Sequence, residues 1–158
     1  MKFTSWNIRG LGSKRKQRLL SNIMKQAAPD VIFIQETKCS IQKIKEIHSK
    51  WLNRFDFLEV KTENTAGGIL TLWNPQKIDM IDAEASRNYL SMIIQPMGDK
   101  EMYLFTNVYS PQRMEGKLLF LDSLKKLRER HATIPWILGR DFNMIKMLLE
   151  KKKEVLEF

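Results

Sequence analysis

The sequence predicts an α/β fold, in which strands and helices alternate along the chain and pack in layers. The first 36 residues supply the main evidence, because a strand-like segment (3–7), a helix-like segment (14–27) and a second strand-like segment (31–34) follow one another. The second of these strands is a nearly continuous apolar run, typical of a strand buried on both faces. No repeat, low-complexity tract or linker interrupts the 158 residues, which indicates a single domain over 1–158.

Three segments have the apolar spacing of amphipathic helices. The first opens with basic residues, and Pro29 and Asp30 end it; its apolar residues are Leu19, Leu20, Ile23, Met24 and Ala27, after Lys14, Arg15, Lys16 and Arg18. The second covers 41–52, with Ile41, Ile44, Ile47, Trp51 and Leu52 facing inward. The third has an apolar face and a basic outer face, made by Leu118, Leu119, Leu121, Leu124 and Leu127 and by Lys125, Lys126, Arg128 and Arg130.

The rest of the chain has mostly the pattern of strands. We expect them near 55–60, 68–73, 78–83, 90–95 and 102–108. Gly98 and Asp99 form a plausible hairpin turn between the last two of these strands. A short buried strand, 136–138, ends at Gly139, Arg140 and Asp141.

Composition excludes several classes of protein. Hydrophobic content of 43% and charged content of 28% are those of a globular chain rather than a disordered one. No apolar run approaches the roughly 20 residues that a membrane span needs, and Asn7 and Arg9 interrupt the apolar stretch that a signal peptide requires. A single cysteine, Cys39, suits a reducing, intracellular compartment. The formal charge of +9 favours polyanionic partners such as nucleic acid, although many basic proteins bind none.

Polar side chains stand where the predicted buried strands end. Asn7 and Glu36 follow the first two strands, residues 107–110 close a later one, and Asp141 and Asn143 follow the last. Loops at strand ends converge on one crevice in layered α/β proteins. Carboxylate and amide oxygens gathered there suit a hard cation such as Mg²⁺, which can stabilise charge on a phosphate during displacement.

Each of these residues also has a simpler interpretation. Glu36 could be an acidic residue in the first turn of a following helix, and Asn7 could be a turn residue. Asp141 and Asn143 could cap a helix that begins at Met144. Position by itself therefore leaves the metal site open.

Five ordered segments carry a family resemblance. They are Ser5-Trp-Asn-Ile-Arg-Gly-Leu-Gly12, Pro29-Asp-Val-Ile-Phe-Ile-Gln-Glu-Thr-Lys38, Gly67-Gly-Ile-Leu-Thr-Leu-Trp73, Asn107-Val-Tyr-Ser-Pro111 and Leu138-Gly-Arg-Asp-Phe-Asn-Met144. Together they resemble the endonuclease/exonuclease/phosphatase superfamily, and their wording is most similar to the endonuclease domains of plant LINE-type (non-LTR) retrotransposons. The resemblance implies a deoxyribonuclease-like four-layer α/β sandwich, with two mixed β-sheets flanked by helices and here incomplete.

The resemblance also implies a role for each site residue. Asn7 and Glu36 would lie at a Mg²⁺ ion (or Mn²⁺), with Glu36 as the direct carboxylate ligand. Tyr109 would lie beside the scissile phosphate. Asp141 would orient or activate the attacking water, and Asn143 would hydrogen-bond the phosphate. Asn107 is interpreted as support for the strand end, and Gly67 and Gly68 as residues that the backbone requires.

Two features depart from the family pattern. Arg140 stands where relatives have glycine or continue directly into the aspartate, so it strains the loop or adds a phosphate contact. Relatives also continue further and supply a second metal-site acid and a late Asp-His pair. His48 and His131 match no motif and are interpreted as ordinary histidines. We therefore expect a truncated domain with little turnover, because general acid–base help typically supplies about 10² to 10⁴ in rate.

The leading hypothesis is accordingly a Mg²⁺-dependent phosphodiester hydrolase of retrotransposon origin that nicks DNA, located in the nucleus if DNA is its substrate. The alternatives are a non-catalytic nucleic-acid-binding remnant, and a phosphatase or ribonuclease of another branch of the superfamily. No membrane or protein partner is inferred. The tail, 144–158, is either a short helix over apolar surface or a run-on without its own role.

Overall fold

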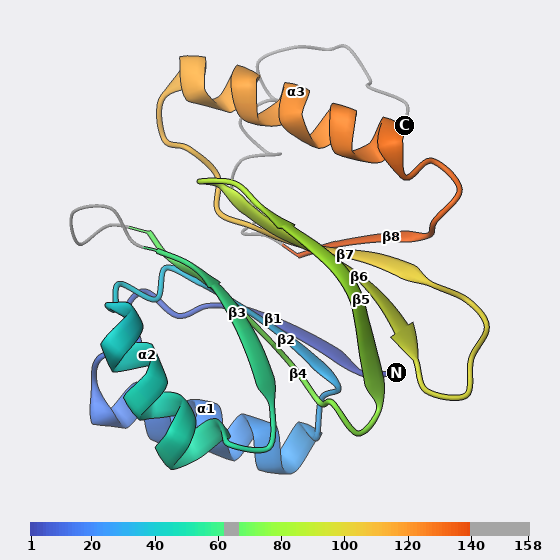
Figure 1. Cartoon of the computed structure of the whole chain (residues 1–158). Helices are drawn as coiled ribbons and strands as arrows, with labels where there is room; N and C mark the ends of the chain where they lie inside the picture. Colours follow the sequence, from blue (N-terminus) through green and yellow to red (C-terminus); the bar gives the residue numbers. More distant parts are fainter. Residues whose placement is uncertain (62–66, 140–158) are drawn as a thin grey trace.

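The computed structural model describes residues 1–61 and 67–139, which form two four-stranded sheets with helices on their outer faces (Figure 1). The first sheet has the strand order β1-β2-β4-β3, from β1 (Phe3–Asn7), β2 (Val31–Gln35), β4 (Ile69–Trp73) and β3 (Asp56–Val60). The second has the order β5-β6-β7-β8, from β5 (Ile78–Ala85), β6 (Tyr89–Pro96), β7 (Tyr103–Val108) and β8 (Trp136–Gly139). Both sheets are mixed, because the β1–β2 and β7–β8 pairs are parallel and the other neighbours antiparallel.

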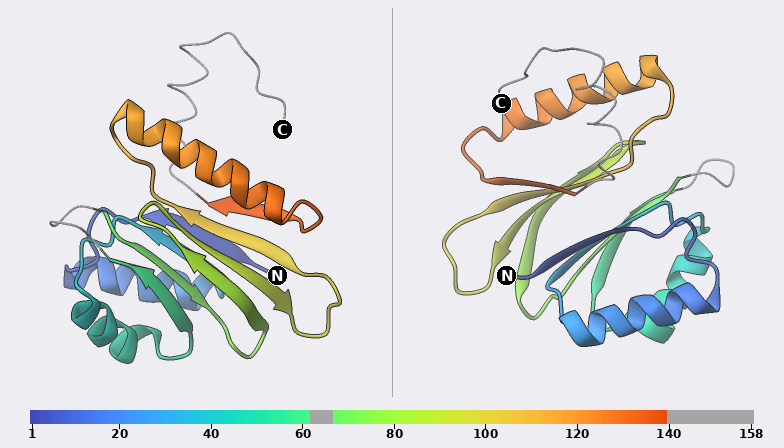
Figure 2. Two further views of the ribbon diagram at one scale, coloured as in Figure 1. Left: turned by 45° about the horizontal axis from the view of Figure 1, so that its top comes forward. Right: turned by 180° about the vertical axis from the view of Figure 1, so that it is seen from behind.

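The layers follow from which face of each strand is apolar. Helix α1 (Lys14–Ala27), helix α2 (Ile41–Ile47) and the π-helical turn η1 (His48–Leu52) pack on the outer face of the first sheet, and α3 (Met114–Arg130) packs on the outer face of the second (Figure 2). A third apolar cluster lies between the sheets and includes Phe33, Trp73, Met92 and Phe105. The predicted α/β sandwich with two mixed sheets and flanking helices is therefore confirmed.

Strand β2 is the centre of this arrangement. Its five residues are all buried, as the apolar run predicted. Alternate side chains face opposite ways, so Ile32 and Ile34 join the cluster under α1 and α2 while Val31 and Phe33 join the cluster between the sheets. This burial on both faces explains why the run is apolar throughout.

Two of the predicted helical faces differ from the structure. In α1, Leu20 and Met24 are buried but Leu19 is exposed. In α3, Leu124 and Leu127 are buried, whereas the N-terminal pair Leu118 and Leu119 is 61% and 72% exposed. Helical spacing identified the helices correctly. One apolar residue in each turn is enough to cover a sheet, and helical spacing does not show which of the apolar residues in a turn is buried.

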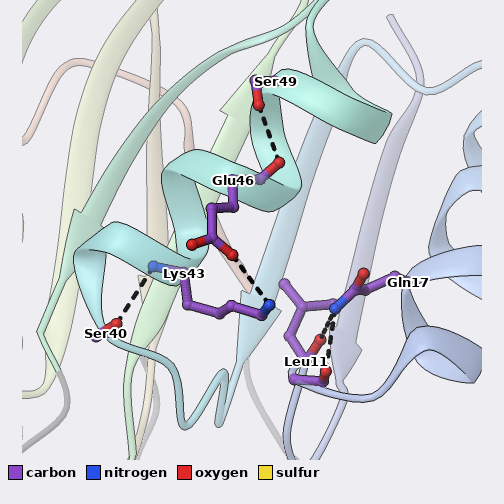
Figure 3. Close-up of polar contacts among 7 residues, drawn as sticks. Leu11, Gln17, Ser40, Lys43, Glu46 and Ser49 are labelled. Atoms are coloured by element: carbon purple, nitrogen blue, oxygen red, sulfur yellow. Dashed lines mark hydrogen bonds and ion pairs between the residues drawn. The ribbon is translucent and has the colours of Figure 1, made fainter.

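Local contacts begin the helices and hold the first loop. Ser13 caps α1 by accepting a hydrogen bond from the Lys16 amide, and Ser40 caps α2 in the same way through Lys43. Figure 3 shows the Ser40 cap, the ion pair of Lys43 with Glu46, and the Gln17 amide donating to the carbonyl of Leu11. The buried Gln17 thereby anchors the loop after β1 against α1.

The predicted turn at Gly98 and Asp99 also exists. The Asp99 amide donates to the Pro96 carbonyl, and Gly98 has a φ of +82°. The strands that it joins pair as neighbours, and the connection between them covers 97–102. In the part of the chain that the structure describes, no helix combines the length and apolar character needed to cross a bilayer.

Candidate functional site

The site begins where the parallel strands β1 and β2 end side by side. Asn7 is the register partner of Gln35 in this parallel pair, and Glu36 directly follows Gln35. The side chains of Asn7 and Glu36 are therefore close together. The Asn7 amide Nδ2 donates to Glu36 Oε1 at 2.9 Å, and Asn7 Oδ1 accepts from the Arg9 amide at 3.3 Å. Two residues that are 29 positions apart in sequence are thus brought into one polar pair.

The backbone at Glu36 is in an unusual conformation. Its φ is +54°, and Lys38 two residues later has a φ of +50°. Residues with a side chain seldom adopt this left-handed region, at a cost of order 1–3 kcal/mol that neighbouring structure must offset. Helix α2 begins only at Ile41, so Glu36 is not an acidic residue in its first turn. The simpler interpretation of Glu36 therefore does not apply.

Backbone hydrogen bonds on both sides hold this strained segment. On one side the Gly10 amide donates to the Glu36 carbonyl at 2.7 Å. On the other side the amides of Thr37 and Lys38 donate to the carbonyls of Gly68 and Gly67. The Lys38 ammonium lies 3.6 Å from Glu36 Oε2, and the Glu36 side chain is 19% exposed. Glu36 is thus rigidly placed while its carboxylate remains accessible.

Tyr109, from the second sheet, lies close to this carboxylate. Burial raises the pKa of the Tyr109 phenol above its ordinary value, the nearby Glu36 charge adds to the rise, and a hydrogen bond with the Gln112 side chain opposes it. Gly67 packs against the ring, since a Cβ there would meet Tyr109 Cε1 at 3.2 Å. Gly67 also has a φ of +80°, which agrees with its interpretation as a residue that the backbone requires. Tyr109 consequently remains a protonated hydrogen-bond donor at neutral pH.

The predicted site also includes residues that follow strand β8. Asp141, Asn143 and Arg140 lie outside the described residues, so their roles stay predictions. Strand β8, which precedes them, ends at Gly139 beside Asn107. Because a Cβ at Gly139 would lie 2.3 Å from the Phe33 ring, only glycine lets β8 approach the first sheet so closely.

Neither histidine belongs to the site. His48 contacts the Phe55 carbonyl through its ring nitrogen and packs on the Phe57 ring at a centroid distance of 4.6 Å. His131 ends α3, where its amide bonds the carbonyls of Leu127 and Arg128. Both sets of contacts are structural, as the absence of a motif around either residue suggested.

The sequence matches the Endonuclease/Exonuclease/phosphatase family over residues 4–150. The chain belongs to this family. Solved structures with the same fold include a family protein from Bacteroides thetaiotaomicron, at a TM-score of 0.73 and 13% identity, covering 90% of this chain and 63% of that one. A mannosyl-6-phosphatase of the same organism matches at 0.68 and 13%, covering 87% and 63%. The AP endonuclease LMAP of Leishmania major matches at 0.62 and 19%, covering 82% and 48%.

The solved structures show how much of a family member this chain covers and how varied the activities of the family are. The chain spans 63% of the length of the first two solved relatives. Members include phosphatases and nucleases, so the family fixes a hydrolase-type fold without choosing the substrate. Members of this family generally depend on a divalent metal.

Two residues of the candidate site carry oxygen atoms of the kind that hard cations bind. Glu36 has a carboxylate, and Asn7 has an amide that here turns its Nδ2 toward Glu36 and its Oδ1 toward the Arg9 amide. Within residues 1–61 and 67–139 no group of three or more His, Cys, Asp or Glu side chains could hold an ion.

Sequence reasoning missed Gln35 as a functional candidate. Its amide Nε2 donates to Asn107 Oδ1 at 2.6 Å and to Ser5 Oγ at 3.1 Å, in the layer between the sheets. The available signal was a polar residue at the end of a strand that is otherwise apolar on both faces. Asn107, interpreted from sequence as support for a strand end, is fully buried and makes the other half of this contact.

Proposed function

We propose that this chain is a Mg²⁺-dependent phosphodiester hydrolase domain that nicks DNA and descends from a plant LINE-type retrotransposon. The observation that carries the proposal is the Asn7–Glu36 pair at the joined ends of β1 and β2, with the Tyr109 ring packed against Gly67, whose carbonyl accepts from the Lys38 amide beside them. The motif wording around Asn7 and Glu36 supports the retrotransposon origin. Mn²⁺ is the expected substitute for Mg²⁺.

The chemistry divides between the ion and the protein. Bound at Glu36 and Asn7, the cation would neutralise charge on the phosphate. Tyr109, a phenol that is protonated at neutral pH, would donate a hydrogen bond to a phosphate oxygen. In this proposal Asp141 orients the attacking water and Asn143 hydrogen-bonds the phosphate. Because neither His48 nor His131 lies at the site, we expect turnover to be slow.

Charge around the site favours a nucleic acid as the substrate. The first 29 residues contain no acidic residue and seven basic ones, namely Lys2, Arg9, Lys14, Arg15, Lys16, Arg18 and Lys25. Lys16 is used structurally, since its ammonium donates to the carbonyls of Ile8 and Arg9 at 2.6 Å each. Arg9, Lys14 and Arg15 are exposed next to the loop that leaves Asn7. Such a one-signed surface suits a phosphate backbone better than a single phosphate monoester.

The first test is a single-turnover plasmid-nicking assay with Mg²⁺, comparing the wild type with Glu36→Gln. We expect slow nicking that requires the metal and disappears in the variant. Glu84→Gln serves as the matched control, because Glu84 pairs with Arg130 on the far sheet and should not matter. Nicking that persists in Glu36→Gln would contradict the proposal.

The same proteins separate the alternatives. Salt-dependent DNA binding without nicking in the wild type would favour a non-catalytic remnant. Release of phosphate from a monoester, without nicking, would favour a phosphatase. For binding, replacing Lys14 and Arg15 by Gln should reduce the salt dependence of the affinity, by a slope of roughly 0.9 for each phosphate that the variant no longer neutralises.

A further inference from the structure

Two buried amides join the sheets directly beneath the candidate site. Gln35 of β2 is 1% exposed and Asn107 of β7 is 0% exposed, and they share a hydrogen bond of 2.6 Å. The residues are 72 positions apart and belong to different sheets. Most of the neighbouring layer is apolar, with the rings of Phe3, Phe33 and Phe105 packed edge to face. A polar contact in this layer therefore needs a reason.

The amides also have further partners on both sheets. Asn107 Nδ2 donates to the Leu70 carbonyl at 3.0 Å and to Thr71 Oγ1 at 3.1 Å, while Gln35 donates to Ser5 Oγ. Strands β1, β2, β4 and β7 are thus connected through side chains. Buried polar groups are costly when unpaired, so a network with this many partners has one preferred geometry.

Each amide closely precedes a site residue. Gln35 is followed by Glu36, and Asn107 lies two residues before Tyr109. Asn107 lies in β7 and its amide bonds the first sheet, while Tyr109 directly follows the end of that strand and packs its ring against Gly67. Ser5, the third member, likewise lies two residues before Asn7.

The need for a fixed contact arises because Tyr109 and Glu36 come from different sheets. Asn7 and Glu36 are set relative to one another by the β1–β2 ladder. No ladder connects β2 with β7, and apolar packing between sheets is non-directional. A hydrogen bond of defined length and angle limits sliding of one sheet over the other, to the sub-ångström tolerance that a functional site needs.

We propose that Gln35 and Asn107 are positioning residues whose hydrogen bond holds Tyr109 in register with the Asn7–Glu36 pair. The proposal rests on the proposed function for the identity of the site, but its geometry is independent of any metal. Gln35 and Asn107 touch no substrate; they act through the residues that follow them.

The test uses Gln35→Met and Asn107→Leu, which keep side-chain size and remove the polar contact, together with the double variant. Ser91→Ala is the matched control, because Ser91 and Thr106 form an equally buried hydrogen bond of 2.7 Å on the opposite face of the second sheet. Global stability is measured for all four, so that variants are compared at known stability.

The first readout is amide hydrogen exchange in metal-free protein. In Asn107→Leu we expect exchange of the Thr37 and Lys38 amides, which bond Gly68 and Gly67, to accelerate at least about tenfold more than exchange of core amides in β6. Ser91→Ala should leave this ratio unchanged. Unaltered exchange at Thr37 and Lys38 in Asn107→Leu and in Gln35→Met would overturn the proposal.

The second readout is the dissociation constant for Mn²⁺. Residues behind a metal ligand typically contribute about 10- to 100-fold to affinity, and we expect a loss in this range for either single variant. The double variant should lose no more Mn²⁺ affinity than either single variant, because the two residues act as a unit. We expect this even if the double variant is more stable than the single variants, since it leaves neither buried amide without its partner. Equal weakening by Ser91→Ala would overturn the positioning role. Faster exchange at Thr37 with no Mn²⁺ binding in the wild type would uphold the positioning and refute the proposed function instead.

Discussion

Strand β2 has a carboxylate at each end, and the two differ in their burial and in their hydrogen-bond partners. Asp30, before the strand, is 6% exposed and accepts hydrogen bonds from the Lys2 amide at 2.7 Å and from Lys77 Nζ at 2.8 Å. Burial by itself raises the pKa of the Asp30 carboxyl, but the bonds from Lys77 and Lys2 outweigh it and lower the pKa below its ordinary value. Asp30 is a paired, structural carboxylate.

Glu36, after the strand, is held by its backbone rather than by its charge. The nearest ammonium, that of Lys38, is 3.6 Å away, and Asn7 supplies a neutral amide. Its left-handed φ is the strained feature, and such strain gathers where structure serves a ligand. The comparison teaches that a carboxylate is buried and paired at one end of the strand, and partly exposed on a strained backbone at the other.

The largest loss of stability is expected in the middle of β2, between its two carboxylate ends. Phe33 lies midway along β2, is fully buried, and contacts the rings of Phe3 and Phe105. Phe33→Ala should lower the free energy of unfolding by about 3–5 kcal/mol, through reduced burial and a cavity, as measured by urea denaturation. Leu119→Ala, on an exposed side chain, is the control and should cost less than about 0.5 kcal/mol. A decrease below about 1 kcal/mol for Phe33→Ala would contradict this packing.

Breaking the paired end comes next. Asp30→Ala should cost about 1–3 kcal/mol at neutral pH, because it leaves the Lys2 amide without its partner. The Asp30 carboxyl has a lower pKa in the folded protein than in the unfolded chain, so its ionised form stabilises the folded state. This stabilisation is fully present above the unfolded pKa of 3.8 and is lost as the pH falls through the lower folded pKa. Unfolding curves of wild type and variant should therefore converge in acid. Lys77→Gln, which removes the exposed partner, should cost less than about 1 kcal/mol.

A smaller effect is expected at the glycine that faces Tyr109. Gly67→Ala and Gly98→Ala both place a side chain at a φ near +80°, which costs about 1–2 kcal/mol in each. Only Gly67 lies against the Tyr109 ring, since Gly98 has nothing within 4 Å. Gly67→Ala alone should therefore weaken Mn²⁺ binding at the site, as followed by calorimetry. Similar losses of binding in the two variants would show that the ring contact is irrelevant.

The smallest change in stability is expected at Glu36. Glu36→Gln keeps an oxygen for the Asn7 amide and removes only the 3.6 Å ion pair with the exposed Lys38, so the free energy of unfolding should change by less than about 0.5 kcal/mol. Loss of Mn²⁺ binding with unchanged stability would sharpen the contrast with Asp30. A destabilisation as large as that of Asp30→Ala would mean that Glu36 is structural too.

Much of the fold could be predicted from local patterns. Apolar runs located β2 and β4, helical spacing located α1, α2 and α3, and polar residues at strand ends located Asn7 and Glu36. These features are readable because burial on one or two faces dictates which residue types a strand or helix contains. The same patterns could not say that Leu118 and Leu119 stay exposed, since that depends on where α3 crosses the second sheet.

The sequence by itself determined the alternation of strands and helices, and the amide and carboxylate that follow the first two strands. Only the tertiary structure decided that the Tyr109 ring packs against Gly67, that Glu36 adopts a left-handed backbone, and that Gln35 bonds Asn107 across the sheets. The physical reason is distance along the chain. The periodicity of apolar residues shows which face of a single strand or helix is buried. Contacts between residues 72 positions apart depend instead on how the two sheets pack against each other.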